Sequence, residues 1–429
     1  MAMNGAREQG QGHFLIVGGG VAGITAALDL ANLGFSVSLV EKEAHLGGQV
    51  AKLDKLYPTD HCAFCPLWTE IKKCTDHPHI ACYKRTTIKG IEQAGARKKV
   101  RLSRNPGSVD EEKCVYCGRC VEVCPVEIDM RTREDHHLQS HAIRPLWDHA
   151  YPPVYTINEG ACTKCGVCEE VCPTGAIALH QGEEEVSLTV EEILWATGFR
   201  EADLSQFEEF GYGTHPDILG SLEFEDWTSE AGPNKGDIRR KSDFSVPKNI
   251  AFVQCVGARD RRRMPYCSAV CCMHALKQIH WIAKRRPEIR CTVFFTDLRT
   301  VGKHYYAYAR AAMDGGNLEL LRGRPAMILP LPGTNHIGIK YENTVTQKVE
   351  LGEFDMVVLN GALVPELSRS GLEPGGMPPL DPDGFLRKEK NTRSPFGCGF
   401  GDQPADVIES VIQASSEALK ALLHSQGER

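Results

Sequence analysis

Short apolar runs separated by glycine-rich turns predict an α/β fold near the N-terminus. Residues 13–17, His-Phe-Leu-Ile-Val, have the composition of a buried strand, and residues 24–32 continue with the 3.6-residue periodicity of a helix. A second apolar strand follows at residues 35–40 and ends at Glu41. Strand, glycine loop, helix and strand therefore follow one another in the order of a dinucleotide-binding unit.

The pattern returns later in the chain. An apolar strand at residues 193–195 ends in Ala196-Thr197-Gly198, and residues 249–254 read as the first strand of a second nucleotide-binding-like fold. Residues 291–295 form another apolar strand, and residues 407–423 read as a final helix. These elements predict a mixed α/β protein with two dinucleotide-binding-like folds.

The loop after the first strand carries a dinucleotide-binding motif, Gly18-x-Gly20-x-x-Gly23. In such a loop the first glycine allows a tight turn, the second lets the backbone approach a pyrophosphate, and the third lets the helix pack closely on the strand. The acid at the end of the second strand is placed to accept hydrogen bonds from a ribose. The predicted cofactor-binding residues here are Gly18, Gly20, Val21, Ala22, Gly23 and Glu41.

Two further segments favour FAD over NAD as the bound dinucleotide. The run from Lys42 to Gly48 and Gln49 resembles the glycine pair that follows the ribose-binding acid in flavoproteins of the glutathione reductase type. The strand end at Thr197 and Gly198 also resembles a flavoprotein segment, although an ordinary strand-ending turn would look the same. The resemblance implies that these residues contact FAD.

Two copies of one cysteine pattern lie between the flavin segments. This spacing holds [4Fe–4S] clusters in bacterial ferredoxins, where the fourth cysteine of each run ligates the cluster of the other run. The runs are Cys114-x2-Cys117-x2-Cys120-x3-Cys124-Pro125 and Cys162-x2-Cys165-x2-Cys168-x3-Cys172-Pro173. We therefore assign Cys114, Cys117, Cys120 and Cys172 to one cluster, and Cys162, Cys165, Cys168 and Cys124 to the other. The alternative, structural zinc, usually shows cysteine pairs separated by a long loop.

Because the doubled run interrupts the flavin segments, we expect it to be an insertion. The predicted organisation is a flexible N-terminus at 1–12, a first FAD-binding segment at 13–106, a two-cluster ferredoxin domain at 107–180, a second FAD-binding segment at 181–244, a second nucleotide-binding-like domain at 245–355 and a C-terminal FAD-binding segment at 356–429. Turn-rich stretches mark both ends of the insertion.

Charge and composition exclude several classes of protein. The 49 basic and 56 acidic residues give a net charge of 49 − 56 = −7, which offers no general footprint for nucleic acid. No stretch approaches the roughly 18 apolar residues of a membrane span, so any membrane link would come through a partner. Eighteen cysteines in 429 residues, with no visible signal peptide, are best read as cluster ligands in the reducing cytoplasm.

The second nucleotide-binding-like fold lacks a glycine loop. After the strand at 249–254, where a second Gly-x-Gly-x-x-Gly would be expected, the chain places four cysteines: Cys255, Cys267, Cys271 and Cys272. Without those glycines the backbone could not approach a pyrophosphate, which argues against NADH as the direct reductant. The arginines between residues 259 and 263 leave phosphate binding open as an alternative.

The run CVGARD…YCSAVCCMHALKQ resembles the signature of the family of heterodisulfide reductase A subunits. The resemblance extends to the N-terminal glycine loop, the DHCAFC segment, both ferredoxin runs and ATGF. It implies a thioredoxin-reductase-like FAD fold in which Cys255, Cys267, Cys271 and Cys272 hold a third [4Fe–4S] cluster near the flavin. It further implies that Lys277 lies near the reactive nitrogen of the flavin. The alternatives are a redox-active disulfide or buried thiols, and a solvated helix lysine.

The chain also departs from the longer family members. The resemblance predicts a short family member, without the additional C-terminal ferredoxin module of the longer ones, and Asp402 matches the acid that meets the flavin ribityl chain only to within a couple of residues. Two readings are open for a further set of cysteines, Cys62, Cys65, Cys74 and Cys82. A fourth metal site is one reading, whereas free thiols near the cofactors and core cysteines are the other. Short relatives include the flavoprotein subunit of quinone-interacting membrane-bound oxidoreductases.

Together these patterns predict a cytoplasmic FAD and iron–sulfur oxidoreductase subunit of the sulfur-acting class, active only in a complex. Its clusters would carry single electrons, and FAD would exchange two. Bifurcation of those electrons is an open extension. The expected partners are other subunits of a heterodisulfide-reductase-like or quinone-interacting oxidoreductase-like complex, with ferredoxin as a further candidate. The alternative function is a flavin-dependent disulfide or persulfide reductase with Cys267, Cys271 or Cys272 as redox thiols, and a third reading is a pure electron carrier.

Overall fold

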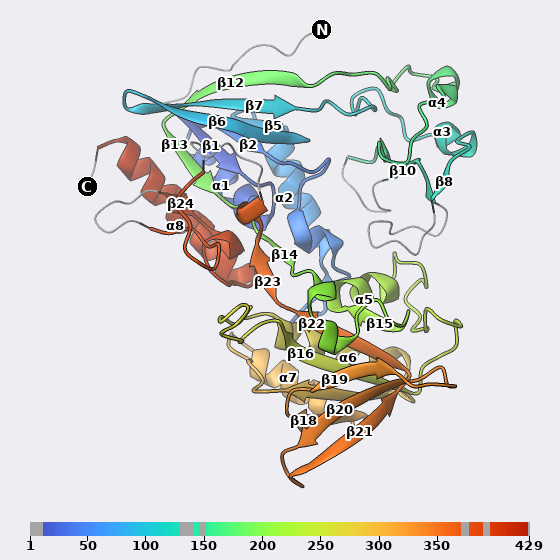
Figure 1. Cartoon of the computed structure of the whole chain (residues 1–429). Coiled ribbons are helices and arrows are strands. Elements are labelled where there is room, and N and C mark those ends of the chain that lie inside the picture. Colours follow the sequence, from blue (N-terminus) through green and yellow to red (C-terminus); the bar gives the residue numbers. More distant parts are fainter. Residues whose placement is uncertain (1–11, 129–139, 146–151, 370–376, 389–394, 428–429) are drawn as a thin grey trace. The chain divides into compact units, whose positions relative to one another are not determined.

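The chain folds into two compact units, each with its own parallel sheet (Figure 1). The structure is a computed structural model, and it describes residues 12–128, 140–145, 152–369, 377–388 and 395–427. Unit 1 comprises Met1–Lys52, Phe64–Phe199 and Pro365–Arg429. Unit 2 comprises Leu53–Ala63 and Arg200–Val364.

A five-stranded parallel sheet forms the centre of unit 1, in the order β24-β13-β1-β2-β5. Its strands are β1 (His13–Val17), β2 (Ser36–Val40), β5 (Ile80–Tyr83), β13 (Glu192–Trp195) and β24 (Phe396–Gly397). Helices α1 (Val21–Asn32), α2 (Phe64–Asp76) and α8 (Val407–Ser425) belong to this unit, and α1 packs against both of the others. Phe14, Leu15 and Ile16 are fully buried, as the apolar run predicts for a strand inside a parallel sheet.

A three-stranded antiparallel sheet carries the cysteine-rich segment. It consists of β6 (Thr86–Ala94), β7 (Arg97–Arg104) and β12 (Glu184–Val190), in the order β12-β7-β6. Glu184 pairs with Arg104, so the chain leaves β7 and returns into β12 at neighbouring positions, as Figure 1 shows. An insertion whose two ends meet on paired strands leaves the pairing of the host sheet undisturbed.

The segment between β7 and β12 is built from very short elements. They are α3 (Arg119–Glu122), β8 (Glu127–Ile128), β9 (Ser140–His141), β10 (Ile143–Pro145), β11 (Tyr155–Ile157) and α4 (Val167–Val171). Its core combines cysteines with aliphatic residues: Val109, Cys120, Ile143, Ile157, Cys168, Ile177 and Leu179. So small an apolar core needs further cross-links to be stable, and metal clusters supply them in such modules.

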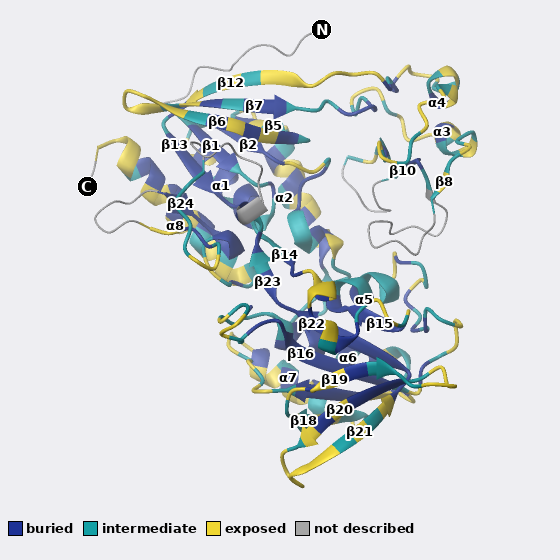
Figure 2. Ribbon diagram, in the orientation of Figure 1, coloured by how far each residue is buried: buried dark blue, intermediate teal, exposed yellow. Residues whose placement is uncertain are grey.

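Unit 2 contains a second parallel sheet, in the order β15-β22-β16-β17-β18. Its strands are β15 (Ile218–Gly220), β16 (Asn249–Val256), β17 (Arg290–Phe295), β18 (Leu318–Arg322) and β22 (Met356–Gly361). The helices are α5 (Ser221–Thr228), α6 (Cys271–Arg285) and α7 (Tyr305–Met313). Strands β16 and β22 are buried almost throughout, as Figure 2 shows.

Each face of this sheet packs against a different partner within unit 2. On one face, Ile250 and Phe252 join a core with Ala275 and Ile279 of α6. On the other face, Val253 and its neighbours pack against an antiparallel sheet of β19 (Met327–Pro330), β20 (Ile337–Asn343) and β21 (Lys348–Phe354). The order of the strands reverses between β16 and β22, which is where open α/β sheets bind ligands.

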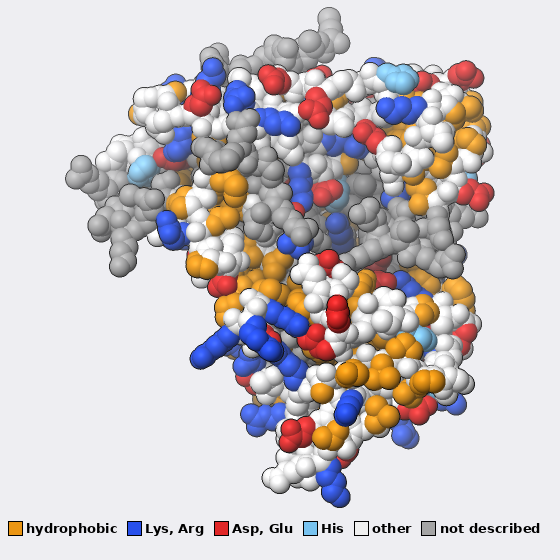
Figure 3. Space-filling view, in the orientation of Figure 1, with side chains coloured by type: hydrophobic (Ala, Val, Ile, Leu, Met, Phe, Trp, Pro, Cys, Tyr) orange, Lys and Arg blue, Asp and Glu red, His pale blue; other side chains and the backbone are white. Residues whose placement is uncertain are grey.

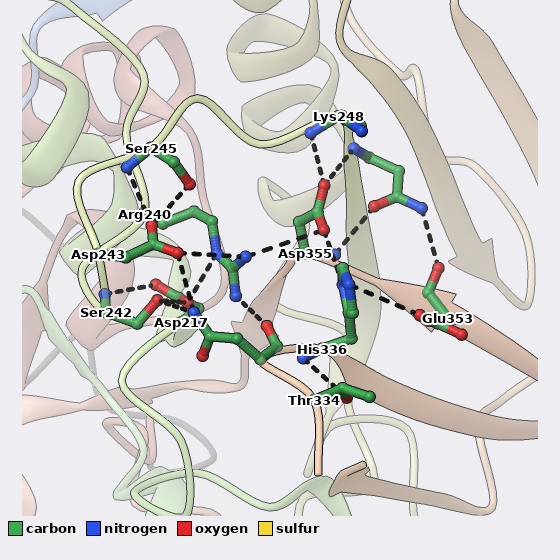
Figure 4. A network of polar contacts seen from close by, with 12 residues as sticks. Asp217, Arg240, Ser242, Asp243, Ser245, Lys248, Thr334, His336, Glu353 and Asp355 are labelled. Atoms are coloured by element: carbon green, nitrogen blue, oxygen red, sulfur yellow. Dashed lines mark hydrogen bonds and ion pairs between the residues drawn. The ribbon is translucent and has the colours of Figure 1, made fainter. Parts of the chain in front are cut away.

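A buried polar network fixes the loop before β16 (Figure 4). The fully buried carboxylate of Asp217 accepts hydrogen bonds from Arg240 Nε at 3.0 Å, Ser242 Oγ at 2.6 Å and two backbone amides. The carboxylate of Asp355 accepts from the amides of Lys248 and Asn249, and it pairs with His336 at 2.9 Å. Because buried carboxylates must have partners, this network sets the position of the 237–248 segment.

The contact-defined units divide the chain differently from the predicted domains. The sequence places residues 200–244 in the second FAD-binding segment, but they group with unit 2 because β15 pairs with β22 and α5 packs on it. Residues 356–364, predicted in the C-terminal FAD-binding segment, also belong to unit 2, where they form β22 and lead into β23 (Leu363–Pro365). Most of the predicted flexible N-terminus at 1–12 lies outside the described residues.

Candidate cofactor sites

The glycine loop of unit 1 has glycine where a side chain would clash. Gly18 has φ +109°, and a Cβ there would lie 2.2 Å from the carbonyl oxygen of Ala196. A Cβ on Gly23 would lie 1.8 Å from the carbonyl oxygen of Gly18. At Gly20, by contrast, the nearest atom to a Cβ would be 3.8 Å away, which leaves open space beside the backbone. Gly18 and Gly23 therefore shape the turn, and the space at Gly20 is where the motif would admit a pyrophosphate.

Glu41, the predicted ribose-binding acid, lies at the end of β2 and is buried. Its two carboxylate oxygens accept hydrogen bonds from the amide of Gly19 at 2.7 Å and from the amide of Glu43 at 2.9 Å. Burial raises the pKa of Glu41, while these two amides oppose the rise. The carboxylate thus ties the glycine loop to β2, and its remaining lone pairs are available for a ribose.

The second glycine pair lies against the first loop. The amide of Gly47 donates to the carbonyl of Gly19 at 2.7 Å, and Gly20 forms an isolated bridge with Gly47. Gln49 donates from its side-chain nitrogen to the carbonyl of Phe199 at 3.2 Å. Lys42 is exposed instead, and its Nζ pairs with Glu366 at 2.6 Å. Of the residues predicted from 42 to 49, the structure brings the glycines to the loop and directs Lys42 away from it.

The strand end at Thr197 meets the C-terminal turn. A Cβ on Gly401 would lie 2.7 Å from Thr197 Oγ1, so the 399–401 turn lies directly against Thr197 and Gly198. Asp402 follows this turn, and its carboxylate accepts from Lys388 Nζ at 3.1 Å. Burial raises the pKa of Asp402, and Lys388 opposes the rise. The structure therefore gathers the predicted residues at 18–23, 41, 47–49, 197–198 and 402 into unit 1.

The residues of this cradle fit a dinucleotide. The hydroxyl oxygen of Thr197 is buried and has no hydrogen-bond partner among the described residues. Buried hydroxyls are normally satisfied, so this one indicates a ligand group beside the 197–198 turn. Together with the open backbone at Gly20 and the start of α1, the cradle offers the contacts that FAD requires.

The two ferredoxin runs bring their cysteines together in the swapped arrangement. One small cavity is lined by Cys114, Cys117, Cys120 and Cys172, and a second by Cys124, Cys162, Cys165 and Cys168. Each set contains three cysteines of one run and the fourth cysteine of the other, as in two-cluster ferredoxins. The proline after each fourth cysteine lines a cavity as well.

The backbone repeats with the sequence. Tyr116 and Lys164, which occupy equivalent positions in the two runs, have φ +53° and +55°. Gly118 and Gly166 begin α3 and α4 with φ +81° and +83°. The amide of Lys164 donates to Cys162 Sγ at 3.3 Å. This repeated loop turns each run around a central space, as cluster binding requires.

Four of the cysteines of unit 2, Cys255, Cys267, Cys271 and Cys272, lie around the carboxyl ends of its central strands. Cys255 lies on β16 with φ +61°, at the point where the register between β16 and β22 shifts. Cys271 Sγ lies 3.9 Å from the carbonyl of Gly361 on β22, and Cys272 Sγ lies 3.8 Å from the carbonyl of Asp297 after β17. Adjacent cysteines on a regular helix point in different directions, and here they start α6 and reach strand ends on either side of β16.

The four thiols are close enough to influence one another electrostatically. Burial and the neighbouring Cys255 and Cys267 raise the pKa of Cys272 to about 11, and burial raises the pKa of Cys271 well above its ordinary value. Thiolates crowded into a buried site need a positive centre to compensate their charge. Four converging cysteines fit an iron–sulfur cluster, for which thiolates are the usual ligands.

Two buried amide side chains lie near the carboxyl ends of β16 and β22. Gln254 is 3% exposed and Asn360 is 0% exposed, and the nitrogen and oxygen of both amides have no hydrogen-bond partner among the described residues. They lie one residue beyond the paired Val253 and Leu359, on the sheet face that packs against α6. Sequence reasoning missed both, because a glutamine or asparagine in an apolar strand shows its lack of partners only in the fold.

Lys277 is buried within unit 2 rather than solvated, which excludes that alternative reading. Its Nζ lies 2.5 Å from Glu225 Oε1 and donates to the carbonyl of Lys55 at 3.0 Å, and the side chain is 2% exposed. Burial acts to raise the pKa of Glu225, but Lys277 and His274 outweigh it and hold the pKa at about 2. Glu225 is a partner that the sequence pattern did not identify, because it lies 52 residues away in the chain.

Cys62, Cys65, Cys74 and Cys82 lie outside the three cysteine quartets. Cys62 belongs to unit 2, whereas Cys65 lies on α2 in unit 1. Cys74 on α2 and Cys82 on β5 have hydrogen-bonded thiols, and this contact raises the pKa of Cys74. Among the described residues, no three His, Cys, Asp or Glu side chains meet closely enough to hold a single metal ion.

Two family descriptions match parts of the chain. Residues 110–176 match the 4Fe-4S dicluster domain, and residues 16–64 match an NAD(P)-binding Rossmann-like domain. The first match covers both cysteine runs, and the second covers the glycine loop and Glu41. The predicted dicluster and FAD-type dinucleotide-binding functions are thereby confirmed. Within the described residues, no helix is both long enough and apolar enough to cross a membrane.

The chain is also similar over nearly its whole length to named proteins of methanogenic archaea. It is 38% identical to the CoB–CoM heterodisulfide reductase iron-sulfur A-subunit 2 of Methanopyrus kandleri and 36% identical to the CoB–CoM heterodisulfide reductase iron-sulfur A-subunit of Methanocaldococcus jannaschii. It is 34% identical to the A-subunit of the H(2):CoB-CoM heterodisulfide,ferredoxin reductase of Methanothermobacter marburgensis. These alignments cover 94–95% of this chain but 63% of each relative, so the chain spans just under two thirds of their length.

Solved structures confirm the fold that the sequence predicts. The chain resembles the thioredoxin reductases of Lactococcus lactis, with TM-score 0.54, and T. acidophilum, with TM-score 0.52, each at 13% sequence identity. These matches cover 97% and 96% of this chain and 100% and 98% of those proteins. At this identity the likeness concerns the two-dinucleotide-binding fold alone.

Proposed function

We propose that this chain, a homologue of the heterodisulfide reductase A-subunit over about 95% of its length, is the FAD and iron–sulfur electron-transfer component of a larger oxidoreductase. The observation that carries the proposal is the pairing, within unit 1, of a dinucleotide cradle with two cysteine quartets. Each quartet draws its fourth cysteine from the other run. This is the ligand pattern of an electron-transfer ferredoxin.

The residues have distinct tasks in this proposal. Gly18, Gly20 and Gly23 would admit the pyrophosphate, Glu41 would bind the ribose, and Thr197 would donate to the flavin moiety. Bound FAD exchanges two electrons and the clusters exchange one each, which lets such a protein join two-electron to one-electron chemistry. Val21, Ala22, Gly48, Gln49, Gly198 and Asp402 would complete the cradle. Lys42 has the weakest support, because its side chain pairs with Glu366.

A third [4Fe–4S] cluster belongs to the proposal. Cys255, Cys267, Cys271 and Cys272 would be its ligands, at the strand ends where other such folds bind a nucleotide. The convergence of the four thiols supports this assignment, and so do Gln254 and Asn360, whose buried amides have no hydrogen-bond partner among the described residues. Lys277 would act beside the flavin as a fixed positive charge, held in position by Glu225.

The proposed setting is the cytoplasm. Eighteen cysteines in 429 residues suit a chain that keeps them for cofactors in a reducing compartment. The partners would be the other subunits of a heterodisulfide-reductase-like or quinone-interacting oxidoreductase-like complex. One relative carries ferredoxin in its name, which makes ferredoxin a candidate donor or acceptor. Bifurcation would follow if the flavin passed its two electrons to acceptors of different potential.

A reductive titration of the anaerobically purified chain tests the proposal. FAD takes up two electrons and each cluster takes up one, so a chain with three clusters should accept about five electrons per FAD from dithionite. Uptake of about four electrons would contradict the third cluster but support a relay with two clusters. About two electrons would contradict the proposed function, because the ferredoxin segment would then hold no redox-active cluster.

A further inference from the structure

An arginine-lined cavity lies in unit 2, beside the four-cysteine motif. Its volume is about 430 Å³, within the usual range for small-molecule sites. Figure 3 shows Lys and Arg side chains gathered on one part of the face of unit 2 that it draws. The cavity is lined by Arg259, Thr296, Arg322, Gly323, Arg324 and Thr344.

The cavity lies at the carboxyl edge of the parallel sheet. Arg259 follows β16, Thr296 directly follows β17, and Arg322 is the last residue of β18. Open α/β sheets bind their ligands in the crevice outside the carboxyl ends of the strands. The lining residues therefore come together where this fold places a ligand site, although the usual glycine loop is absent.

Positive charge dominates the cavity walls. Arg259 pairs with Asp297 at 2.8 Å, and the carboxylate of Asp297 is 54% exposed. Arg324 donates to the backbone carbonyls of Cys255 and Ala258, and Arg322 donates to the carbonyl of Thr296. These backbone contacts fix the positions of the guanidinium groups without neutralising them. Each guanidinium has five N–H donors, more than these contacts use.

We propose that this cavity binds a compact polyanion of the class of inorganic pyrophosphate. Guanidinium groups held rigidly at fixed positions suit phosphate oxygens, to which they donate in pairs. The hydroxyl of Thr296 adds a further donor, whereas the hydroxyl of Thr344 donates to the carbonyl of Arg322 at 2.8 Å. The lining includes no aromatic or large aliphatic side chain on which a nucleobase could stack, so the recognised group is the anion and not a nucleoside.

Titration calorimetry with inorganic pyrophosphate on the whole, cofactor-loaded chain tests the proposal. The expected result is saturable binding of one pyrophosphate per chain that weakens as salt is added, because the contacts are ionic. Absence of saturable binding at low salt would overturn the proposal.

Arg322→Gln is the most direct variant, because it removes one guanidinium and leaves the arginines that hold the cysteine loop. It should weaken pyrophosphate binding at least tenfold. Arg290→Gln is the matched control, since Arg290 is an exposed arginine at the opposite end of the neighbouring strand β17. This control should bind like the wild type. An equal loss in both variants would show that only general surface charge is involved, and would contradict the site.

Two further measurements make the test independent of the folding of a variant. In the wild type, pyrophosphate should protect Arg322 from phenylglyoxal modification, as read by mass spectrometry, but it should not protect Arg290. ADP should bind no more tightly than pyrophosphate. Tenfold tighter binding of ADP would overturn the assignment to a compact anion and indicate a nucleotide site.

The cavity also adjoins the cluster motif, and this consequence rests on the proposed function. Arg259 contacts the Cys255 thiol, and Arg324 binds the Cys255 carbonyl. Pyrophosphate should therefore lower the reduction potential of the third cluster, because a bound anion disfavours the added electron. Binding without a third cluster would leave the anion site standing and contradict only the cluster assignment. If pyrophosphate binds but the reduction potential of the third cluster does not change, the predicted effect on the cluster is refuted and the binding site stands.

Discussion

Single residues in the glycine loop have separable structural tasks. Gly23 is surrounded by backbone, since a Cβ there would lie 1.8 Å from the carbonyl oxygen of Gly18. Gly20 faces open space, and its φ of −77° is accessible to any residue. The motif therefore combines a glycine required by the fold with a glycine required by the ligand.

Gly23→Ala should destabilise unit 1, and Gly20→Ala should not. The clash at Gly23 forces α1 away from the loop, and we expect a loss of about 3 kcal/mol together with the loss of bound FAD. Gly20→Ala should fold normally yet retain less FAD, because its methyl group would occupy the space of the pyrophosphate. Thermal unfolding measures the stability of the two variants, and their FAD content measures cofactor binding. Equal stability of both variants would contradict the division of tasks.

Gln254 and Asn360 are the clearest single-residue evidence at the third site. A buried amide without a partner costs roughly 1–3 kcal/mol. Each follows one residue of the Val253–Leu359 pair near the ends of β16 and β22, and neither has a partner among the described residues, so both call for a further donor or acceptor. Cluster sulfurs accept hydrogen bonds, and such bonds stabilise the reduced, more negative cluster.

Asn360→Leu should therefore lower the reduction potential of the third cluster, by on the order of tens of millivolts. The two ferredoxin clusters are the internal control, because no change occurs near their cysteines. A redox titration followed by electron paramagnetic resonance resolves the three potentials. An unchanged third potential, with the iron content intact, would show that the amide does not reach the cluster.

At the scale of elements, α6 joins two chemical features within unit 2. Its first turn carries Cys271 and Cys272, and its second turn carries Lys277, whose Nζ lies 2.5 Å from Glu225 on α5. Both charged groups of this pair are at least nine-tenths buried. Removing one partner of such a pair leaves an isolated buried charge, which proteins tolerate poorly.

Glu225→Gln should lower the stability of unit 2 by about 3–5 kcal/mol. The exposed Glu288, which pairs with Arg286 at 3.7 Å, offers a control whose change to Gln should cost less than about 1 kcal/mol. The double variant Glu225→Gln, Lys277→Met should recover much of the loss, because it removes the unpaired charge. Thermal unfolding of the three variants decides the matter, and a Glu225→Gln variant as stable as the wild type would refute it.

The same pair predicts how stability depends on pH. The pKa of Glu225 is held at about 2, below its ordinary value of 4.5, and this difference corresponds to about 3 kcal/mol. Because the folded-state pKa is the lower one, the contribution is complete above pH 4.5 and is lost as the pH falls toward 2. Glu225→Gln should therefore flatten the acid side of the stability curve.

The pattern of apolar runs and turns predicted the strands and helices well. Contacts between residues far apart in the sequence could be seen only in the folded structure. The strands around the glycine loop and the strand at 249–256 follow from apolar runs bounded by turns, because these signals lie within a few residues of one another. Glu225 could not be assigned to Lys277 from sequence, since the two meet only after α5 and α6 pack. The grouping of residues 200–244 with unit 2 likewise depends on the long-range pairing of β15 with β22.

On the scale of the whole molecule, the chain combines a thioredoxin-reductase-like fold with two cysteine-rich features. One is a ferredoxin module that enters and leaves through paired strands. The other replaces a glycine loop by four cysteines at the ligand-binding edge of the second sheet. A fold that elsewhere accommodates two dinucleotides thus offers one dinucleotide cradle and three cysteine quartets, which is the composition expected of an electron relay.

The central claim is tested most directly by the iron content per FAD of the anaerobically purified chain, in the wild type and in Cys272→Ala. Four irons per cluster predict about twelve irons and twelve acid-labile sulfides per FAD for the wild type, and about eight for the variant. Ser103→Ala, on β7 and outside the cysteine runs in sequence, is a handling control that should match the wild type. About eight irons in the wild type, with the thiols of Cys255, Cys267, Cys271 and Cys272 open to alkylation, would contradict the third cluster and favour a thiol-based reductase.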